Sequence, residues 1–295
     1  MAPQALDKER CLASGKGRDD GGKMTDLLIL GATGKVGRLL KARWSASLDT
    51  LWQTRGAPLG PDWVQAALQA PLPQAKVLFV LSGVTSGDEA ALSQNSAIAE
   101  ATCQAALAMG ARHVLFASTM AVYGPNPWAA EGDAPRSPNA YGTSKLAAEA
   151  VAERVLGGTK VGLTALRLGN VVGADLLGVM RARGGRLKLD RFLDGQGPYR
   201  SYLGPSLMAR VVEGLTLQVL AGKPLPRVLN IAAQAPLGMA DLLQAAQIGF
   251  DWAEAMPTAL QRVAMDCSAL AALIPPHPAL ETAEALAKDW LEITP

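Results

Sequence analysis

Leu27-Leu-Ile-Leu-Gly31-Ala-Thr-Gly34-Lys-Val-Gly37 joins an apolar segment to a glycine-rich turn, and this combination indicates the fold of the chain. Its apolar residues predict a buried strand, and three glycines at every third position lead directly into a helix predicted over Val36–Trp44. In a dinucleotide-binding loop of this kind, the first glycine permits the tight turn, the second lets the backbone approach a pyrophosphate, and the third allows close packing of helix on sheet. The helix N-terminus would offer free N–H groups to the phosphates. An ordinary glycine-rich turn is the alternative for the motif taken alone. The cofactor-binding residues predicted in this loop are Gly31, Thr33, Gly34, Lys35, Val36 and Gly37.

Outward from this loop, short apolar runs alternate with helical stretches along most of the chain. Such alternation predicts an α/β fold: a Rossmann-like, doubly wound parallel sheet with helices on both faces and a small C-terminal substrate-binding lobe. Gly110 is expected to end a long Ala-rich helix, and Pro61 to begin a short one. The further strands expected are Thr50–Thr54, Lys76–Leu81, Arg112–Ala117, Val161–Leu166 and Val228–Ile231, and the further helices are Pro61–Ala70, Asp88–Met109 and Ala140–Leu156.

The chain divides by composition into three parts. Residues 1–23 are polar, charged and Gly-rich, which predicts a disordered extension. Residues 24–168 carry the regular alternation and are expected to form the NAD(P)-binding Rossmann core. Turn residues multiply after Gly169, so residues 169–295 are expected to form a substrate-binding lobe interleaved with the last strands of the core. Ligands of doubly wound sheets bind beyond the carboxyl ends of the strands, where these irregular segments would build the substrate side of a cleft.

Charge and composition exclude several classes of protein. Lys and Arg number 28 against 26 Asp and Glu, so the net charge of +2 gives no global drive toward nucleic acid or an anionic membrane. No apolar run reaches the roughly 18 residues of a membrane span, and no secretory signal is recognisable, which predicts a cytoplasmic protein. Three scattered cysteines without a CxxC pair and only two histidines predict no metal site. His113 begins an apolar run and is interpreted as a strand-edge residue.

The end of the second predicted strand bears on the choice of cofactor. NAD-specific sites usually place an acidic residue there to hold the ribose hydroxyls, but this strand ends in Gln53-Thr54-Arg55. Arg55 would pair with the 2′-phosphate of NADP through its forked donors, so NADP is favoured over NAD. A solvated surface arginine is the alternative.

Tyr141 and Lys145 form the candidate catalytic pair. Four residues apart on a predicted helix, they share one face. An ammonium beside a phenol favours the phenolate, so Lys145 is expected to lower the pKa of Tyr141. Tyr141 would then exchange a hydroxyl proton with a substrate while a nicotinamide exchanges hydride.

Three further segments carry a family resemblance. Thr119 precedes Val122-Tyr123-Gly124, the Tyr–Lys pair follows, and Arg167-Leu-Gly-Asn170-Val-Val-Gly173 comes next. In this combination the chain resembles the extended short-chain dehydrogenase/reductases, the sugar-nucleotide epimerase/dehydratase group, from about Asp26 to its C-terminus. The resemblance implies that Tyr141 is the acid/base, that Lys145 also binds the nicotinamide ribose, and that Thr119 hydrogen-bonds the reacting substrate oxygen.

The resemblance extends to supporting and substrate-binding residues. Ser82 stands where the family has small cofactor-binding residues, and Asn95 matches a position that supports the site from behind, with a solvated helix residue as the alternative. The segment from Asp194 to Tyr202 resembles a stretch whose arginine grips a substrate diphosphate. This implies such a role for Arg200, unless it is a plain surface residue, with Asn170 near the same phosphates.

The chain also departs from the family pattern. Met120-Ala121 replaces the Asp-Glu pair of the family's dehydratases, which disfavours a 4,6-dehydratase. The usual third strand and its helix are shortened, the C-terminal lobe is short, and the aspartate expected downstream of Arg200 is replaced around Pro205-Ser206. Family members often dimerise through the helix of the Tyr–Lys pair and its predecessor, so a homodimer is expected from the resemblance. The Ala-rich faces of these helices fit a dimer and packing within one subunit equally well.

These features predict an NAD(P)-dependent epimerase or ketoreductase acting at a hydroxyl or ketone carbon of a small-molecule substrate, a sugar that is nucleotide-linked in one version. The first alternative is an NADPH-dependent carbonyl reductase with a non-nucleotide substrate. The second is a non-catalytic dinucleotide-sensing protein on the same fold, although such proteins typically lose the Tyr or the Lys.

Overall fold

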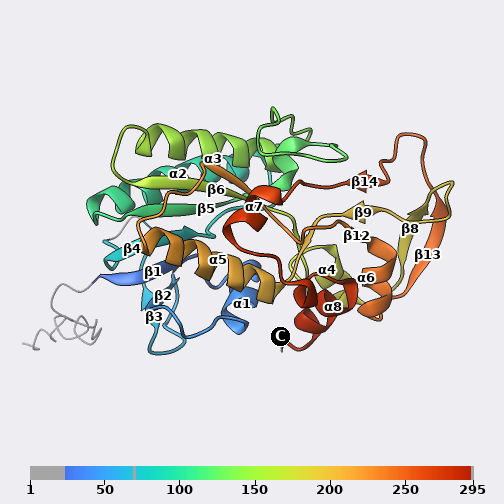
Figure 1. The fold of residues 1–295 in the computed structure, drawn as a ribbon, viewed down its shortest axis with the longest axis horizontal. Helices are drawn as coiled ribbons and strands as arrows, with labels where there is room; N and C mark the ends of the chain where they lie inside the picture. The colour runs from blue at the N-terminus through green and yellow to red at the C-terminus, as the bar shows by residue number, and fades with distance from the viewer. Residues whose placement is uncertain (1–23, 69–70, 294–295) are drawn as a thin grey trace, which may run out of the picture.

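A seven-stranded parallel sheet forms the centre of the computed structural model, which describes residues 24–68 and 71–293 (Figure 1). The strand order β11-β6-β5-β4-β1-β2-β3 confirms the predicted doubly wound topology, in which the chain starts in the middle and builds outward in both directions. The strands are β1 (Thr25–Leu30), β2 (Thr50–Thr54), β3 (Trp63–Gln65), β4 (Ala75–Val80), β5 (His113–Thr119), β6 (Gly162–Leu168) and β11 (Val228–Ile231).

Helices cover both faces of the sheet, α1 (Lys35–Ala42) and α5 (Pro205–Leu220) one face and α2 (Glu89–Ala108) and α3 (Ala140–Leu156) the other. This explains why the buried part of β1, Leu27–Leu30, is a continuous apolar run. Leu27 and Ile29 pack into the core beneath α1 and α5, whereas Leu28 and Leu30 pack into the core beneath α2 and α3 (Figure 1). A strand of this kind cannot alternate between apolar and polar residues, because neither face meets water.

Local signals in the sequence predicted most of these boundaries. The ranges of β2, α3 and β11 are as predicted. Helix α2 begins after Asp88, whose carboxylate accepts a hydrogen bond from Ala91 N at 2.8 Å, and Gly110 follows it with a φ of 68°. The small residues of α2 and α3 lie in the core that these helices share, so that face is used within one subunit. They include Ala99, Cys103, Ala106, Ala148 and Ala152.

The predicted helix over Pro61–Ala70 is wrong for the part that the structure describes. Trp63–Gln65 forms the edge strand β3 instead, with Trp63 opposite Trp52 of β2 and their rings 6.3 Å apart. Trp52 N donates to Asp62 O at 2.9 Å, which ties the segment to the sheet from its start. The helical spacing of apolar residues was overridden because tryptophan and valine pack well on a half-buried sheet edge. Residues 69–70 lie outside the described part, and the described residues between β3 and β4 contain no helix.

The chain after Gly169 contributes both to the sheet layers, through α5 and β11, and to a small lobe beyond the carboxyl ends of the strands (Figure 1). The lobe holds three small sheets: β7 with β10, β8 with β13, and β9 between β12 and β14. Its strands are β7 (Asn170–Val171), β8 (Leu187–Arg191), β9 (Tyr199–Arg200), β10 (Tyr202–Leu203), β12 (Leu237–Gly238), β13 (Phe250–Glu254) and β14 (Arg262–Val263). Its helices are α4 (Leu176–Arg183), α6 (Met239–Ala245), α8 (Ala283–Leu291) and the 3-10 turn η2 (Pro278–Leu280), whereas α7 (Ser268–Leu273) packs against β11 of the central sheet.

Asp289 of α8 caps the N-terminus of α5 from a distant part of the chain. Its carboxylate accepts hydrogen bonds from Ser206 N at 2.7 Å and Ser206 Oγ at 2.6 Å, and it pairs with Arg43 Nε at 2.7 Å. The acidic residue missing near Pro205-Ser206 in the sequence is therefore supplied in space by α8, which ties α1, α5 and α8 together.

The predicted disordered extension, residues 1–23, lies outside the described residues. Within residues 24–68 and 71–293, no helix is both long enough and apolar enough to cross a membrane.

Candidate active site

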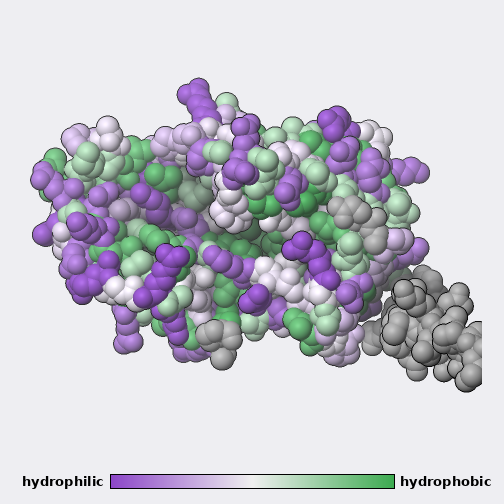
Figure 2. All heavy atoms as spheres, turned by 180° about the vertical axis from the view of Figure 1, so that it is seen from behind, coloured by the Kyte–Doolittle hydropathy of each residue, from purple (hydrophilic) through white to green (hydrophobic). Residues whose placement is uncertain are grey.

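The carboxyl ends of four neighbouring strands bring the predicted cofactor and catalytic residues to one edge of the sheet. Gly31 follows β1, Ser82 follows β4 closely, Thr119 ends β5, and Asn170 lies just after β6. The lobe faces this edge (Figure 1). Seen from behind, the surface is hollowed between the lobe and the sheet layers, with hydrophobic residues in and around the hollow (Figure 2).

The glycine loop has the geometry of a dinucleotide cradle. Gly31 has a φ of 80°, and a Cβ there would lie 2.6 Å from Ser82 N, so the turn must stay bare to approach β4. A Cβ on Gly37 would lie 2.4 Å from Ala32 O, which keeps α1 close to the sheet. Gly34 is the N-cap of α1 and offers no side-chain cap. The open helix N-terminus therefore fits a pyrophosphate.

Gln53 holds this loop in place, a role that the sequence analysis missed. Its Oε1 accepts a hydrogen bond from Gly31 N at 3.0 Å, its Nε2 donates to Ala66 O, and the side chain is buried. A buried side-chain amide near the end of β2 thus supports the glycine loop. No local signal marked it, because the bond joins residues 22 positions apart.

The basic residues around the loop are exposed. Arg55 follows β2 and Lys35 begins α1, and both side chains reach solvent. Arg38 donates from Nε to Thr33 O at 2.9 Å, across the loop. Lys35 and Arg38 thus lie at the start of α1 and Arg55 lies after β2, and the strand end Gln53-Thr54-Arg55 carries no carboxylate.

Tyr141 and Thr119 are brought together across two elements. Tyr141 begins the first turn of α3, Thr119 ends β5, and the phenol and the hydroxyl are hydrogen-bonded. Burial raises the pKa of Tyr141, and the bond to Thr119 lowers it. The net direction is opposite to the prediction that Lys145 would lower this pKa, because desolvation of the phenol is the largest influence.

Lys145 lies one turn further along α3 and points into the interior. Its Nζ is 4.6 Å from the centroid of the Phe116 ring and 3.7 Å from the place where Gly83 would carry a Cβ. Burial lowers the pKa of Lys145 to about 8, and the charge of Glu149 raises it. Within the described residues the ammonium makes no hydrogen bond, so its donors face the bare backbone after β4 and fit a ribose diol.

Asn95 is buried in α2 rather than solvated. Its Oδ1 accepts from Val84 N at 2.8 Å, and its Nδ2 donates to Val84 O at 2.9 Å and to Ser144 Oγ at 3.0 Å. The amide thereby joins the loop after β4 to the helix that carries the Tyr–Lys pair, as the resemblance implied for a supporting residue.

A buried ion pair behind the site was not predicted. Arg167 donates to Glu149 from Nη2 at 2.8 Å and from Nε at 3.3 Å, and Ser118 Oγ donates to the same carboxylate. The Arg167 guanidinium also lies 4.7 Å from the centroid of the Tyr123 ring, and Tyr123 Oη donates to Asn230 Oδ1 at 2.7 Å. One signal was available in the sequence, since Glu149 follows Lys145 by four residues and shares its helix face.

Asn170 and Arg200, the substrate residues predicted besides Thr119, lie near each other. Asn170 Nδ2 donates to Ser201 O at 3.3 Å and contacts Met120 Sδ at 3.8 Å, which places it between the turn after Thr119 and the lobe. Arg200 donates to three main-chain carbonyl oxygens, of Tyr199 at 2.8 Å, Gln261 at 2.9 Å and Leu260 at 3.3 Å. Its guanidinium therefore joins β9 to the segment before β14, and only part of its donor fork stays free for a phosphate.

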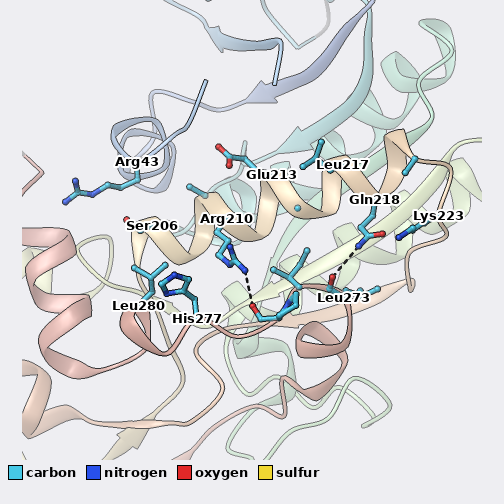
Figure 3. Close-up of a pocket in the computed structure, with 15 residues that line it drawn as sticks. Arg43, Ser206, Arg210, Glu213, Leu217, Gln218, Lys223, Leu273, His277 and Leu280 are labelled. Carbon is cyan, nitrogen blue, oxygen red and sulfur yellow. Dashed lines mark hydrogen bonds between the residues drawn. The ribbon is translucent and has the colours of Figure 1, made fainter. Parts of the chain in front are cut away.

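A separate groove of about 650 Å³ runs along α5, on the face of the sheet away from α3 (Figure 3). Arg210 Nη2 donates to Pro275 O and Gln218 Nε2 donates to Leu273 O, both at 3.3 Å, so polar residues of α5 hold the end of α7 and the segment that follows it (Figure 3). None of the catalytic candidates lines this groove.

A glycine loop on the first strand of a doubly wound sheet, with a Tyr–Lys pair beside it, defines a Rossmann-type nicotinamide-dinucleotide protein. The model of the NAD dependent epimerase/dehydratase family matches residues 27–187, more than half of the chain. The chain belongs to this family, as the sequence motifs predicted.

Solved structures share the fold at low sequence identity. MoeE5 in complex with UDP-glucuronic acid and NAD is 21% identical with a TM-score of 0.68, over 90% of this chain and 98% of that one. UDP-glucose 4-epimerase from Brucella ovis in complex with NAD is 16% identical with a TM-score of 0.73, over 89% and 96%. TunA, an NAD-dependent NDP-hexosamine 5,6-dehydratase, is 18% identical with a TM-score of 0.64, over 91% and 98%. A search of the curated proteins found no significant sequence match.

Proposed function

We propose that this protein is an NAD(P)-dependent epimerase or ketoreductase that acts at a hydroxyl or ketone carbon, with Tyr141 as its acid/base. The observation that carries the proposal is the meeting of Thr119, Tyr141 and Lys145 at the sheet edge that also holds the glycine loop. A sensing protein would have no use for a hydrogen-bonded Tyr–Thr pair beside a buried ammonium, so catalysis explains the arrangement better than binding alone.

The residues that would hold the dinucleotide follow from the geometry. The N-terminus of α1, from Gly34 to Gly37, would bind the pyrophosphate, with Thr33 beside it, and Ser82 would line the nicotinamide side. Lys145 would bind the ribose hydroxyls with its unengaged donors. When bound, the nicotinamide would supply hydride chemistry, twice on opposite faces for an epimerase or once for a reductase.

Tyr141 would transfer the proton, and Thr119 would assist it. Burial raises the pKa of Tyr141, so the phenol carries its proton at neutral pH and is ready to donate to a carbonyl oxygen that becomes a hydroxyl. Thr119 would hold the same substrate oxygen through its hydroxyl. In the oxidising direction, the bond from Thr119 would stabilise the phenolate that accepts the hydroxyl proton.

Arg200 and Asn170 would contact the substrate on the lobe side. The free part of the Arg200 fork and the amide of Asn170 are suited to phosphate oxygens. MoeE5 was solved in complex with UDP-glucuronic acid, and the Brucella enzyme is a UDP-glucose 4-epimerase. These points support a nucleotide-linked sugar. The three carbonyl bonds of Arg200 instead favour the alternative, an NADPH-dependent carbonyl reductase with a substrate lacking a diphosphate.

NADP is favoured over NAD as the cofactor. Arg55 after β2 and Lys35 and Arg38 at the start of α1 would lie on the adenosine side of a bound dinucleotide, and the Gln53 side-chain amide is bonded to Gly31 of the loop. A 2′-phosphate would meet cations there and no carboxylate. MoeE5 and the Brucella epimerase were solved with NAD, so the argument for NADP comes from this chain's own residues.

A 4,6-dehydratase is disfavoured because Met120 and Ala121 lie in the turn η1 (Met120–Tyr123) after Thr119. Neither side chain can protonate a leaving hydroxyl or remove a carbon-bound proton.

Replacing Tyr141 by Phe tests the proposal. Titration of the purified protein with NADPH and with NADH, followed by nicotinamide fluorescence, should show binding of both the wild type and Tyr141→Phe, with NADPH binding more tightly. Turnover would be measured on UDP-sugars by product NMR and on diphosphate-free ketones by NADPH consumption. The variant should lose about 10²–10⁴-fold in turnover, the usual contribution of a positioned acid/base. Undiminished turnover would refute the role of Tyr141, and failure of the wild type to bind either dinucleotide would refute the proposed function.

A further inference from the structure

We propose that Glu149 is a positioning residue of this active site, a single buried carboxylate that joins the ends of β5 and β6 to α3 and acts as the countercharge of the Lys145 ammonium. The inference rests on the proposed function, since it assigns Glu149 a part in placing Lys145 and Thr119 for a bound dinucleotide and substrate.

The Glu149 carboxylate holds three elements at one point. Ser118 and Arg167 lie opposite each other in the register of β5 and β6, and both donate to Glu149 of α3. The side chains of Arg167 and Glu149 are only 5% and 11% exposed, so water competes little for these bonds. These bonds fix the position of α3 along the directions of β5 and β6.

The position of α3 along β5 determines how far Tyr141 lies from Thr119. Ser118 immediately precedes Thr119, and Glu149 lies two helical turns after Tyr141, whose phenol bonds to Thr119. The Glu149–Ser118 bond and the Tyr141–Thr119 bond therefore span the same two elements, one on each side of Lys145. Loosening the first would let α3 shift relative to β5 and would lengthen the second.

The charges around Lys145 point to the same residue. The ammonium is packed by Phe116 of β5, by the bare Gly83 after β4 and by α3 itself, where Tyr141 and Glu149 flank it one turn before and after. Asn95 of α2 faces Gly83 with a neutral amide, and Arg167 of β6 reaches the area only through Glu149. One carboxylate thus serves two buried cations.

The consequence is a defined pH dependence. The pKa of Lys145 is about 8, with burial lowering it and Glu149 raising it. A lysine bound to a ribose through its ammonium loses donors as the pH rises through that value. Without the charge of Glu149 its pKa would fall further, so the loss would begin at a lower pH.

The test compares Glu149→Gln with Glu153→Gln, the same change one turn later on an exposed stretch of α3. The affinity for NADPH would be measured by fluorescence from below to above pH 8, the approximate pKa of Lys145. Glu149→Gln should bind on the order of tenfold more weakly at that pH, equivalent to about 1.4 kcal/mol, and its affinity should decline from a lower pH than in the wild type. Glu153→Gln should follow the wild-type curve.

A Glu149→Gln curve that overlays the wild type would overturn this inference and leave the proposed function standing. A wild type that binds neither dinucleotide would overturn both. If Glu149→Gln does not fold, Ser118→Ala removes one buried bond to the carboxylate without changing charge, with Ser93→Ala on exposed α2 as its control. Ser118→Ala should lower turnover and affinity by several-fold, about 1 kcal/mol, and equal behaviour of the two serine variants would refute the positioning role.

Discussion

Two carboxylate–guanidinium pairs in this molecule have similar geometry and opposite surroundings. Glu149 and Arg167 meet at the end of the central sheet with side chains 11% and 5% exposed, whereas Arg186 and Asp251 meet on the outer sheet of the lobe with side chains 58% and 60% exposed. Both pairs are multiply bonded, with Arg186 donating from Nε at 3.0 Å and from Nη2 at 2.8 Å. The contacts alone would rank them as equals.

The two pairs differ in their exposure to solvent. The Glu149–Arg167 pair is called the inner pair and the Arg186–Asp251 pair the outer pair. Around the outer pair, water solvates each charge almost as well as its partner does, so the pair contributes little to the free energy of folding. Around the inner pair, each charge has left water and depends on its partner, which makes removal of one partner costly. Substitutions in the inner pair are therefore expected to lower both stability and function. Substitutions in the outer pair are expected to change neither.

The largest expected effect is from Arg167→Met, which leaves Glu149 buried with Ser118 as its remaining hydrogen-bond donor. The free energy of unfolding should fall by about 3–5 kcal/mol, the range for breaking a buried ion pair from one side. Urea denaturation followed by circular dichroism measures it. A change below about 1 kcal/mol would mean that the inner pair behaves like the outer one, and the contrast drawn from burial would fail.

The two histidines of the chain also differ in burial, and this difference predicts a dependence of stability on pH. His113 is buried at the start of β5, its Nε2 bonded to Thr164 Oγ1 at 2.9 Å, whereas His277 is exposed. Burial lowers the pKa of His113 from 6.5 to about 4. Above pH 6.5 both folded and unfolded states hold it neutral. As the pH falls from about 6.5 to about 4, only the unfolded state takes up the proton, so stability decreases with falling pH.

The loss attributable to His113 is on the order of 3 kcal/mol across that window, at about 1.4 kcal/mol for each pKa unit. His113→Gln should remove this part of the pH dependence, seen as a flatter curve of unfolding free energy against pH relative to the wild type. His277→Gln serves as the matched control and should keep the wild-type slope. Equal slopes in the two variants would contradict the assignment to His113.

The smallest expected effect is from Arg186→Gln in the outer pair. The free energy of unfolding should change by less than about 1 kcal/mol, and NADPH affinity should stay at the wild-type value, since the pair is solvated and belongs to the outer sheet of the lobe. Thermal unfolding and the same fluorescence titration check both points. A loss comparable to that of Arg167→Met would show that the outer sheet supports the core in a way that burial does not reveal.

Local patterns predicted the parts of the site that are built from neighbours in sequence. The glycine loop follows its strand directly, and Tyr141 and Lys145 share one helix face at a spacing of four. The structure of these features can be predicted from the local sequence, because helix periodicity and backbone turn geometry depend on only a few neighbouring residues. The Trp63–Gln65 strand was missed for the complementary reason, since its pairing with Trp52 and β2 outweighed a helical spacing of apolar residues.

Residues that act through distant contacts had no such signal. Gln53 holds the loop across 22 positions, and Asp289 caps α5 across 83. Their residue types are common on surfaces, and only the folded chain gives them partners. The same holds for the direction of the Tyr141 pKa, because the extent of burial depends on what packs around the phenol.

Periodicity, glycine spacing and side chains one helical turn apart were enough to specify the doubly wound sheet, the dinucleotide loop and the Tyr–Lys pair. Which charges are buried, and what they contact, depends on the folded chain: Glu149 lies between Ser118 and Arg167, Lys145 packs against Phe116 and Gly83, and Arg200 bonds to main-chain carbonyls. The reason is physical, because the strength of an ion pair and the pKa of a side chain depend on the water excluded around them. That exclusion is a property of packing among segments far apart in the chain.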